Sequence, residues 1–179
     1  RSVTQSIFVE LFKKGDIVED LRPNIYDPVE GTTIADAEVE RLPRKTKLID
    51  VRWTCEDGTE LVISTTRPEL ICACGVVVVH PDDDRYQHLI GQRISLPLET
   101  RGRATTVEVQ QHPSVKSEFG TGVLMVCSFG DQNDVAVFRE LGLTPFQAID
   151  LEGKMTEVSG PLHGLTVMDA RLRAIELLE

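Results

Sequence analysis

The sequence lacks the features that define membrane and secreted proteins. Its longest apolar run, near residues 71–79, is too short to span a bilayer. The first residues do not have the charged-then-apolar layout of a signal peptide, and the chain does not begin with Met. We therefore expect a cytoplasmic protein that does not bind membranes, and a piece of a longer chain.

Cysteine is scarce, and its spacing does not fit a zinc site or a disulfide framework. Cys72 and Cys74 lie two residues apart in a strand-like run, whereas Cys55 and Cys127 are isolated. A zinc site requires two Cys-x-x-Cys-like pairs or added histidines, and the four histidines have no ligand spacing. We expect buried, reduced thiols and no metal.

Positive charge is also scarce. The chain has 29 acidic and 19 basic residues and a formal net charge of -10. Because phosphate neutralisation dominates nucleic-acid affinity, this balance argues against strong RNA binding by the isolated chain. It leaves open a domain that meets only the end of an RNA held elsewhere. The local basic cluster is either a solvated face or a contact for RNA phosphates; it consists of Arg41, Arg44, Lys45, Lys47 and Arg52.

The chain of 179 residues reads as a single domain, residues 1–179, with many short strands. Alternating apolar residues over 47–55 and 60–64, joined by Asp57-Gly58, predict a β-hairpin. Residues 74–80 predict a strand buried on both faces. The remaining patterns predict strands at 94–98, 105–109 and 123–128, helices at 5–14, 82–90, 134–141 and 168–179, and irregular structure over 17–35.

These elements do not alternate as strand-helix-strand units. Many short strands with a few helices favour a mainly β fold with peripheral helices, built on a β-barrel core.

The sequence Thr-Thr-Arg-Pro-Glu-Leu at residues 65–70 follows the second hairpin strand. Proline at 68 keeps Arg67 out of a helix, so the loop leaves backbone N–H groups and the hydroxyls of Thr65 and Thr66 available. The pair of threonines alone fits a capped strand end. The adjacent guanidinium of Arg67 favours a phosphate or carboxylate contact.

Two carboxylates lie one helical turn apart in Gly-Asp-Gln-Asn-Asp at residues 130–134. Asp131 is placed to cap the helix that follows, which leaves Asp134 to project into a cavity and bind an ammonium group. The preceding Gly120-Thr121-Gly122 allows close backbone approach, although a simple turn explains it equally well. No Ser-His or Cys-His pattern indicates covalent catalysis.

The order of these motifs resembles the editing domain (CP1) of archaeal-type valyl-tRNA synthetases, which are class I synthetases. The resemblance is carried by Thr-Thr-Arg-Pro-Glu, His-Pro-Asp-Asp-Asp-Arg-Tyr, Leu-Ile-Gly, Phe-Gly-Thr-Gly and Gly-Asp-Gln-Asn-Asp, in the family's order over nearly the whole chain. The leucyl loop resembles Thr-Thr-Arg-Pro-Asp-Thr and the isoleucyl loop Thr-Thr-Thr-Pro-Trp-Thr. The valyl enzyme therefore fits better.

The resemblance implies the β-barrel fold of class I synthetase editing domains and hydrolysis of threonine mischarged on tRNA(Val). A valine pocket cannot strongly reject threonine, a limit for which the valyl enzyme is itself a standard example, so a second hydrolytic site is needed. By matching positions, Asp134 anchors the amino group and Asp131 recognises the threonine. Thr65 and Thr66 surround the ester with Arg67.

Further matches place a substrate-binding surface around these residues. Phe119 matches an aromatic residue near the tRNA end and could stack on the last base. Bacterial-type domains carry Lys and Thr where this chain has Met125 and Cys127, and Thr where it has Leu70, so we expect Asp131 to supply more of the threonine recognition. The substrate-binding residues implied in this way are Arg67, Glu69, Leu70, Phe119, Gly120, Thr121, Gly122, Met125 and Cys127.

The resemblance implies no cofactor for editing, no metal and no covalent intermediate, with ATP used by the separate synthetic domain. The expected partners are the 3′ end of tRNA(Val) carrying threonine and the remainder of the synthetase chain. The alternatives are an isoleucyl or leucyl editing domain, a tRNA-docking insertion whose pocket has decayed, and a metal-binding or redox module that uses the cysteines.

Overall fold

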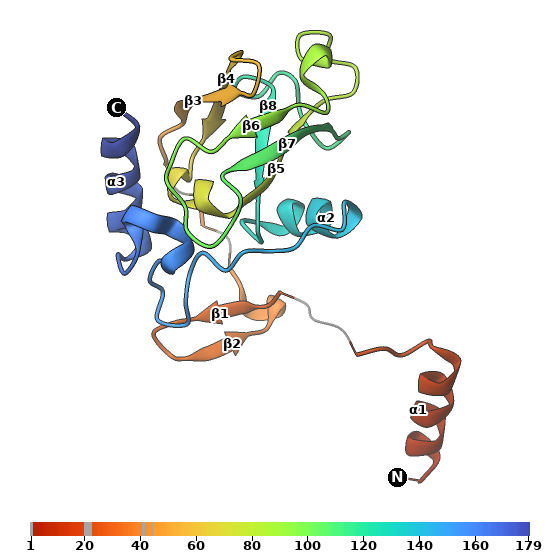
Figure 1. Cartoon of the computed structure of the whole chain (residues 1–179). Helices are drawn as coiled ribbons and strands as arrows, with labels where there is room; N and C mark the ends of the chain where they lie inside the picture. The colour runs from red at the N-terminus through yellow and green to blue at the C-terminus, as the bar shows by residue number, and fades with distance from the viewer. Residues whose placement is uncertain (1, 20–22, 41, 44) are drawn as a thin grey trace.

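A computed structural model describes residues 2–19, 23–40, 42–43 and 45–179, and its body is a curled six-stranded sheet (Figure 1). The six strands are β3 (Ile49–Cys55), β4 (Glu60–Thr65), β5 (Cys74–Val79), β6 (Arg93–Ser95), β7 (Thr106–Gln111) and β8 (Val123–Cys127). Their order in the sheet is β4-β3-β6-β7-β5-β8, with β5 and β7 parallel and the other neighbours antiparallel. The edge strands β4 and β8 also lie beside each other, so the sheet forms a nearly closed barrel. This confirms the predicted mainly β fold with a barrel-like core.

The predicted hairpin is formed by β3 and β4. Trp53 pairs with Leu61, and the turn between the strands contains Gly58 at φ 86°. Burial alternates along β3, with Val51, Trp53 and Cys55 facing the core. The alternation of apolar and polar residues in the sequence therefore gives β3 one face that points into the barrel and one that points to solvent.

Strand β5 is buried on both faces, as its continuous apolar sequence predicted. Val77 and Val79 lie in the barrel core, whereas Val76 and Val78 face outward. Helix α2 (Gln132–Glu140) covers the outward face and buries Phe138 there. A side chain at Gly75 would approach the Phe138 ring to 2.5 Å, so only glycine lets α2 pack this closely.

Of the two other α-helices, α3 (Val167–Leu178) lies against the barrel and α1 (Ser2–Lys14) stands apart from it, and the short connections contain 3-10 turns (Figure 1). Helix α1 has no buried residue, whereas α3 buries Ala170 and Ala174. The predicted helix at 82–90 is wrong except for a single 3-10 turn. The 3-10 turns are η1 (Asp36–Glu38), η2 (Pro68–Ala73), η3 (Gln87–Leu89) and η4 (Glu157–Leu162).

The prediction of irregular structure over residues 17–35 is also wrong in part. Strands β1 (Ile25–Asp27) and β2 (Thr32–Ile34) form a small antiparallel hairpin below the barrel (Figure 1). The carboxylate of Asp27 accepts the N–H of Val29 at 2.8 Å, and Gly31 has φ 66°. The turn is thus held by a hydrogen bond from the backbone to the Asp27 side chain. It lacks the Asn-Gly or Asp-Gly pair from which such hairpins are usually predicted.

Within the described residues, no helix has the length and apolar content needed to cross a bilayer. The four cysteines are buried free thiols, as expected.

The packing of α2 on β5 predicts a large difference between two Phe→Ala substitutions. Phe138→Ala should lower the free energy of unfolding by about 3–5 kcal/mol, because it removes a ring that is 2% exposed and leaves a cavity. Phe8→Ala in α1 is the matched control; its ring is 54% exposed, and the expected loss is below about 0.5 kcal/mol. Urea unfolding measures both, and equal losses would contradict this assignment of the core.

Candidate active site

The pairing of β5 with β8 brings together two segments that the sequence singled out. Cys74, the first residue of β5, is opposite Cys127, the last residue of β8. The threonine loop leads through η2 into β5, and Gly-Asp-Gln-Asn-Asp follows β8. The antiparallel register therefore places residues 65–73 beside residues 128–134.

The threonine loop begins at the last residue of β4. The Thr65 side chain is buried, and its Oγ1 accepts the backbone N–H of Arg67 at 3.0 Å. This bond turns the chain sharply before Pro68 starts η2. Thr66 is half-buried, and no hydrogen bond links its hydroxyl to another described residue. Of the two hydroxyls, that of Thr66 is the one available to a ligand.

Arg67 joins the two segments directly. Its Nη1 donates to the backbone carbonyl of Gly130 at 2.9 Å, across 63 residues of sequence. Its Nε donates to Oε1 of Glu69 at 3.3 Å. One guanidinium therefore contacts both the threonine loop and the turn that leads into α2.

Glu69 is buried between two arginines. Its side chain is fully buried, and Arg171 of α3 donates to it twice, from Nη2 at 2.7 Å and from Nε at 3.0 Å. The sequence prediction placed Glu69 among substrate-binding residues; in the fold, its carboxylate contacts two arginines instead. The pairing of Arg171 with Glu69 could not be predicted from the sequence, because the two residues are 102 positions apart and Arg171 lies on an ordinary amphipathic helix.

The two aspartates at the start of α2 have different environments. Asp131 is the N-cap, and its Oδ1 accepts the N–H of Asn133 at 2.7 Å and that of Asp134 at 2.9 Å. Asp134 turns toward the barrel, where its Oδ2 accepts the N–H of Cys127 at 3.4 Å. A side chain at Gly130 would collide with the Asp134 carboxylate, so glycine is needed for this orientation.

The pKa of Asp134 is raised from 3.8 to about 7. Burial is the largest cause, and the negative charge of Asp131 adds to it. The N–H of Cys127 and the positive charge of Arg67 act in the opposite direction. Near neutral pH this carboxyl group is therefore poised between its two protonation states, as is common at functional sites.

The turn between β8 and α2 is strained. Phe129 has φ 53°, which is the left-handed region that a non-glycine residue rarely adopts. Its ring lies 6.2 Å from that of Phe138 and is 43% exposed. The strain occurs directly beside the Gly130 carbonyl that Arg67 contacts.

The Gly-Thr-Gly loop packs against the end of β4. Gly120 has φ 57°, and a side chain there would come within 2.7 Å of the Ser64 side chain. The hydroxyl of Tyr86 donates to the Thr121 carbonyl at 2.7 Å, and the Thr121 Oγ1 is buried without a partner among the described residues. Gly122 has φ 80°. The glycines thus bring this loop to the same end of β4 as the threonine loop.

The remaining predicted residues divide between core and surface. Leu70, Met125 and Cys127 are buried in the barrel core. A hydrogen bond with Cys74 and burial raise the pKa of the Cys127 thiol, so it is not a reactive thiolate. Phe119, in contrast, is 64% exposed at the rim.

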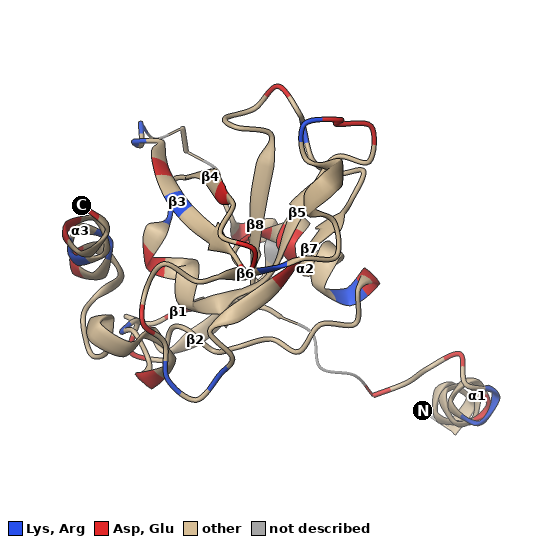
Figure 2. Cartoon of the chain, turned by 45° about the horizontal axis from the view of Figure 1, so that its top comes forward, with Lys and Arg blue, Asp and Glu red and all other residues tan. Residues whose placement is uncertain are grey.

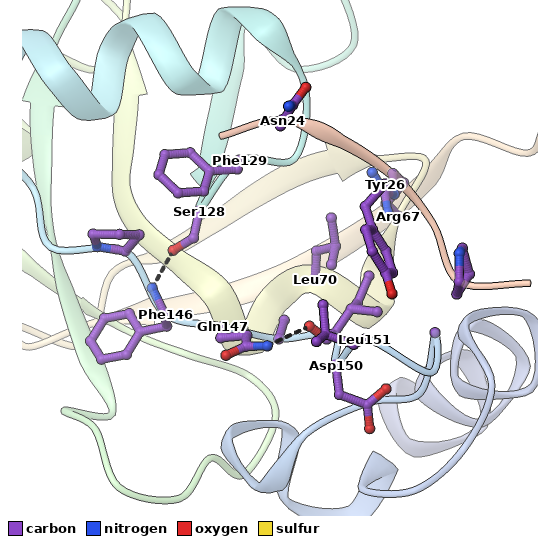
Figure 3. Close-up of a pocket in the computed structure, with 15 residues that line it drawn as sticks. Asn24, Tyr26, Arg67, Leu70, Ser128, Phe129, Phe146, Gln147, Asp150 and Leu151 are labelled. Atoms are coloured by element: carbon purple, nitrogen blue, oxygen red, sulfur yellow. Dashed lines mark hydrogen bonds between the residues drawn. The ribbon is translucent and has the colours of Figure 1, made fainter. Parts of the chain in front are cut away.

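A cavity of about 550 Å³ lies beside Arg67 (Figure 3). Arg67 and Leu70 form part of its wall, together with the aromatic rings of Tyr26, Phe129 and Phe146. None of the four residues predicted to be catalytic lines it. Arg67 therefore links the cavity to the turn that precedes α2. The contribution of the β1–β2 hairpin was missed because those residues read as irregular.

Two sequence expectations concern charge and metal. Lys45, Lys47 and Arg52 are exposed, and Arg52 shares β3 with the acidic Asp50, so the strand carries both signs (Figure 2). Arg41 and Arg44 lie outside the described residues. Across the described ranges, no three His, Cys, Asp or Glu side chains are grouped so that they could hold a metal ion.

Sequence comparison relates the chain to one segment of valine-tRNA ligases, while no family model matches it. It is 43% identical to the enzyme of Aeropyrum pernix over 180 residues, which is 100% of this chain and 21% of that protein. It is 44% identical to the enzyme of Methanopyrus kandleri, covering 96% of this chain and 19% of that protein. The chain thus spans about a fifth of the length of the curated relatives that it matches.

Structure comparison relates the fold to leucyl-tRNA synthetases. The crystal structure of GlLeuRS-CP1 matches with a TM-score of 0.53 and 14% identity, covering 66% of this chain and 79% of that one. The Agrobacterium radiobacter K84 enzyme, in a ternary complex with tRNA and LeuAMS, matches with a TM-score of 0.53 and 19% identity, covering 96% of this chain and 30% of that one. At these identities the likeness shows a shared fold.

The environment of Asp134 predicts a pH-dependent cost to stability. Because its pKa is raised to about 7 in the folded chain, the folded state holds the proton more tightly than the unfolded state. The free energy of unfolding should therefore fall as pH rises from about 4 to about 7. Asp134→Asn removes this charge and should stabilise the chain by about 2 kcal/mol above pH 7, since water reaches part of the side chain and screens the effect.

Urea unfolding between pH 4 and pH 8 measures this dependence. The control is Asp84→Asn, which changes an exposed aspartate in the same way. A similar gain in both variants, or no gain at Asp134, would contradict the raised pKa.

Proposed function

We propose that this chain, which belongs to the valyl-tRNA synthetase family as the counterpart of its CP1 editing domain, hydrolyses the ester bond of threonine mischarged on tRNA(Val). The observation that carries the proposal is the position of Asp134. Its half-buried carboxylate lies at the start of α2 and is linked through Arg67 and the Gly130 carbonyl to the threonine loop. A cationic amine and an ester can therefore be held at one place.

Asp134 is the group that captures the amine. An esterified amino acid carries a free ammonium group, and a partly buried carboxylate binds such a group by charge-assisted hydrogen bonds. Its arrival stabilises the ionised form of Asp134 and so lowers the pKa, which burial and Asp131 raise to about 7 in the chain itself. Binding of the substrate thus offsets the cost of the buried charge.

The threonine loop orients the ester. Two polar groups near the turn before α2 can contact a ligand, namely the Thr66 hydroxyl and Nη2 of Arg67. Neither has a hydrogen-bond partner among the described residues. In this scheme they position a water molecule on the ester carbonyl, and the free hydroxyl of the terminal ribose helps to stabilise the developing oxyanion. The water oxygen bonds to the ester carbonyl carbon, the bond from that carbon to the ribose oxygen breaks, and the ribose oxygen takes up one proton of the water. The other proton passes to solvent, and threonine leaves with its carboxylate. Neither a covalent intermediate nor a cofactor takes part.

Threonine recognition falls to Asp131. Leu70, Met125 and Cys127 are buried apolar or thiol side chains and offer little to a hydroxyl. Asp131 uses Oδ1 for the helix cap, and no described residue bonds its Oδ2. That oxygen can accept the threonine hydroxyl, which valine lacks.

The remaining parts of the proposal concern partners. The exposed Phe119 is placed to stack on the last base of the tRNA. With a net charge of -10, the chain needs the rest of the synthetase to deliver the tRNA(Val) end. ATP belongs to the separate synthetic domain, and the whole enzyme acts in the cytoplasm.

The first test removes the amine anchor. Asp134→Ala should abolish deacylation of threonyl-tRNA(Val), a loss of at least about 100-fold, because the ammonium has no counter-charge and the ester is no longer positioned. Asp84→Asn should leave the rate unchanged. Circular dichroism verifies that both variants are folded, and deacylation by folded Asp134→Ala at the wild-type rate would remove Asp134 from its role.

The same assay separates the competing functions. Threonyl-tRNA(Val) should be hydrolysed faster than the mischarged valyl-tRNA(Ile) or isoleucyl-tRNA(Leu). Preference for valyl-tRNA(Ile) would indicate an isoleucyl editing specificity, and preference for isoleucyl-tRNA(Leu) a leucyl one. No hydrolysis of any of them, by the chain or by the full-length enzyme, would indicate a docking insertion.

The second test addresses specificity. Asp131→Asn keeps the helix cap, since asparagine caps as well as aspartate, and so preserves the fold. It weakens the acceptor for the threonine hydroxyl, and we expect kcat/KM for threonyl-tRNA(Val) to fall by about tenfold. Equal hydrolysis of the threonyl substrate by the variant and the wild type would show that another group reads the hydroxyl.

A further inference from the structure

The Glu69 carboxylate is a fully buried charge shared between two guanidinium groups. Arg171 binds it through two nitrogens, at 2.7 and 3.0 Å, in the bidentate geometry that arginine and carboxylate favour. Arg67 binds it through Nε alone, at the longer distance of 3.3 Å. Most of the compensation for the buried charge therefore comes from Arg171.

This unequal division leaves Arg67 available to the site. Its Nη1 contacts the Gly130 carbonyl at 2.9 Å, directly before the aspartates of α2. The Arg67 side chain is 37% exposed, so it has room to change its rotamer. Its hydrogen-bond partners therefore contribute to where the guanidinium lies.

We propose that Arg171 is a positioning residue: by neutralising Glu69, it keeps the guanidinium of Arg67 on the Gly130 carbonyl beside Asp134. The inference rests on the proposed hydrolysis, because it concerns the geometry of that same site. Arg171 does not line the cavity and acts only through Glu69 and Arg67.

The physical reason is the cost of an unpaired buried charge. Without Arg171, Glu69 keeps only the single contact from Arg67, and a buried carboxylate requires more. Arg67 then turns toward Glu69 to form a bidentate pair and gives up the Gly130 carbonyl. The threonine loop and the α2 turn lose their direct link.

The pKa of the Asp134 carboxyl should respond to this movement of Arg67. The groups that face it are Arg67 and the N–H of Cys127, which lower its pKa, and Asp131, which raises it together with burial. The Cys127 thiol is also close by, and its raised pKa keeps it neutral. Withdrawal of Arg67 removes the nearby positive charge, so the carboxyl of Asp134 should ionise at higher pH.

A purely structural role for Arg171 makes a different prediction. Helix α3 is also held by the buried Ala170 and Ala174, and its N-cap is Thr166. If Arg171 only fastened α3 to η2, its loss would lower stability without altering the titration of Asp134. Neutralising Glu69 in addition would then not restore the site.

The experiment compares four variants of the 179-residue chain. They are Arg171→Met, Arg171→Lys, the double variant Arg171→Met/Glu69→Gln, and Arg173→Met. Arg173 is the matched control, because it lies on the same helix and pairs at the surface with Glu176 at 2.9 Å. Deacylation of threonyl-tRNA(Val) is measured from pH 5.5 to 8.5 with each substitution placed in the full-length enzyme, and the Asp134 carboxyl is titrated by NMR in the 179-residue chain without tRNA.

We expect kcat/KM for Arg171→Met to fall by about 10- to 100-fold, with the pH midpoint and the NMR titration of Asp134 moved to higher pH. Arg171→Lys keeps the charge but not the bidentate contact and should show a smaller shift in the same direction. Arg173→Met should match the wild type. The double variant should recover to within about threefold of wild type, because the neutral amide that replaces the Glu69 carboxylate no longer draws Arg67 away.

An unmoved titration of Asp134 in Arg171→Met and Arg171→Lys would overturn the inference, as would a double variant as impaired as Arg171→Met. If Arg171→Met does not fold, Arg171→Lys and the double variant decide the question by the same criteria. Failure of the wild-type chain and the full-length enzyme to hydrolyse threonyl-tRNA(Val) would count against the proposed function. The NMR titration would still show whether Arg171 controls the position of Arg67.

Discussion

The antiparallel pairing of β5 with β8 is the constraint on which the site depends. Strand β5 is apolar on both faces, so it must lie inside the structure, between β7 and β8 and under α2. Its register with β8 sets Cys74 opposite Cys127. A shift of one residue would exchange the two faces of β5 and place a side chain where Gly75 now lies under Phe138, so the packing of α2 on β5 also determines which loops meet at this end.

The charges beside Asp134 are arranged around the guanidinium of Arg67. Asp134 is partly desolvated and lies close to Asp131, and both conditions raise its pKa. Arg67 opposes them while contacting the Gly130 carbonyl. A carboxyl group balanced in this way is ready to ionise when a cationic ligand arrives, which links its environment to the proposed capture of an amine.

Stability and function draw on the same buried groups. Glu69 contributes to the attachment of α3 through Arg171 and to the position of Arg67. The left-handed Phe129 and the crowded Gly130 place the start of α2 at a strained turn. Such strain persists because β8 and α2 are fixed on either side by the core.

Local patterns carried much of the fold. The Asp-Gly turn and alternating residues of β3 and β4 specify a hairpin, and the unbroken valines of β5 specify a doubly buried strand, because both depend on side-chain periodicity alone. The hairpin of β1 and β2 was not found, since its turn relies on the Asp27 side chain rather than on a recognised dipeptide. Residues 82–90 form turns and the short η3 instead of the expected helix, because the Asp83 side chain accepts the N–H and the guanidinium of Arg85, and such local bonds compete with a helix.

The sequence by itself determined the barrel-forming strands, the cap at Asp131 and the candidate residues of the two motifs, because these follow from neighbours within a few positions. Only the tertiary structure decided that Glu69 faces Arg171, that Arg67 reaches Gly130, and that a cavity opens beside the β1–β2 hairpin. These contacts join residues 63 and 102 positions apart, and their geometry depends on how the whole barrel closes. The pKa of Asp134 likewise depends on burial and on charges brought in by that closure.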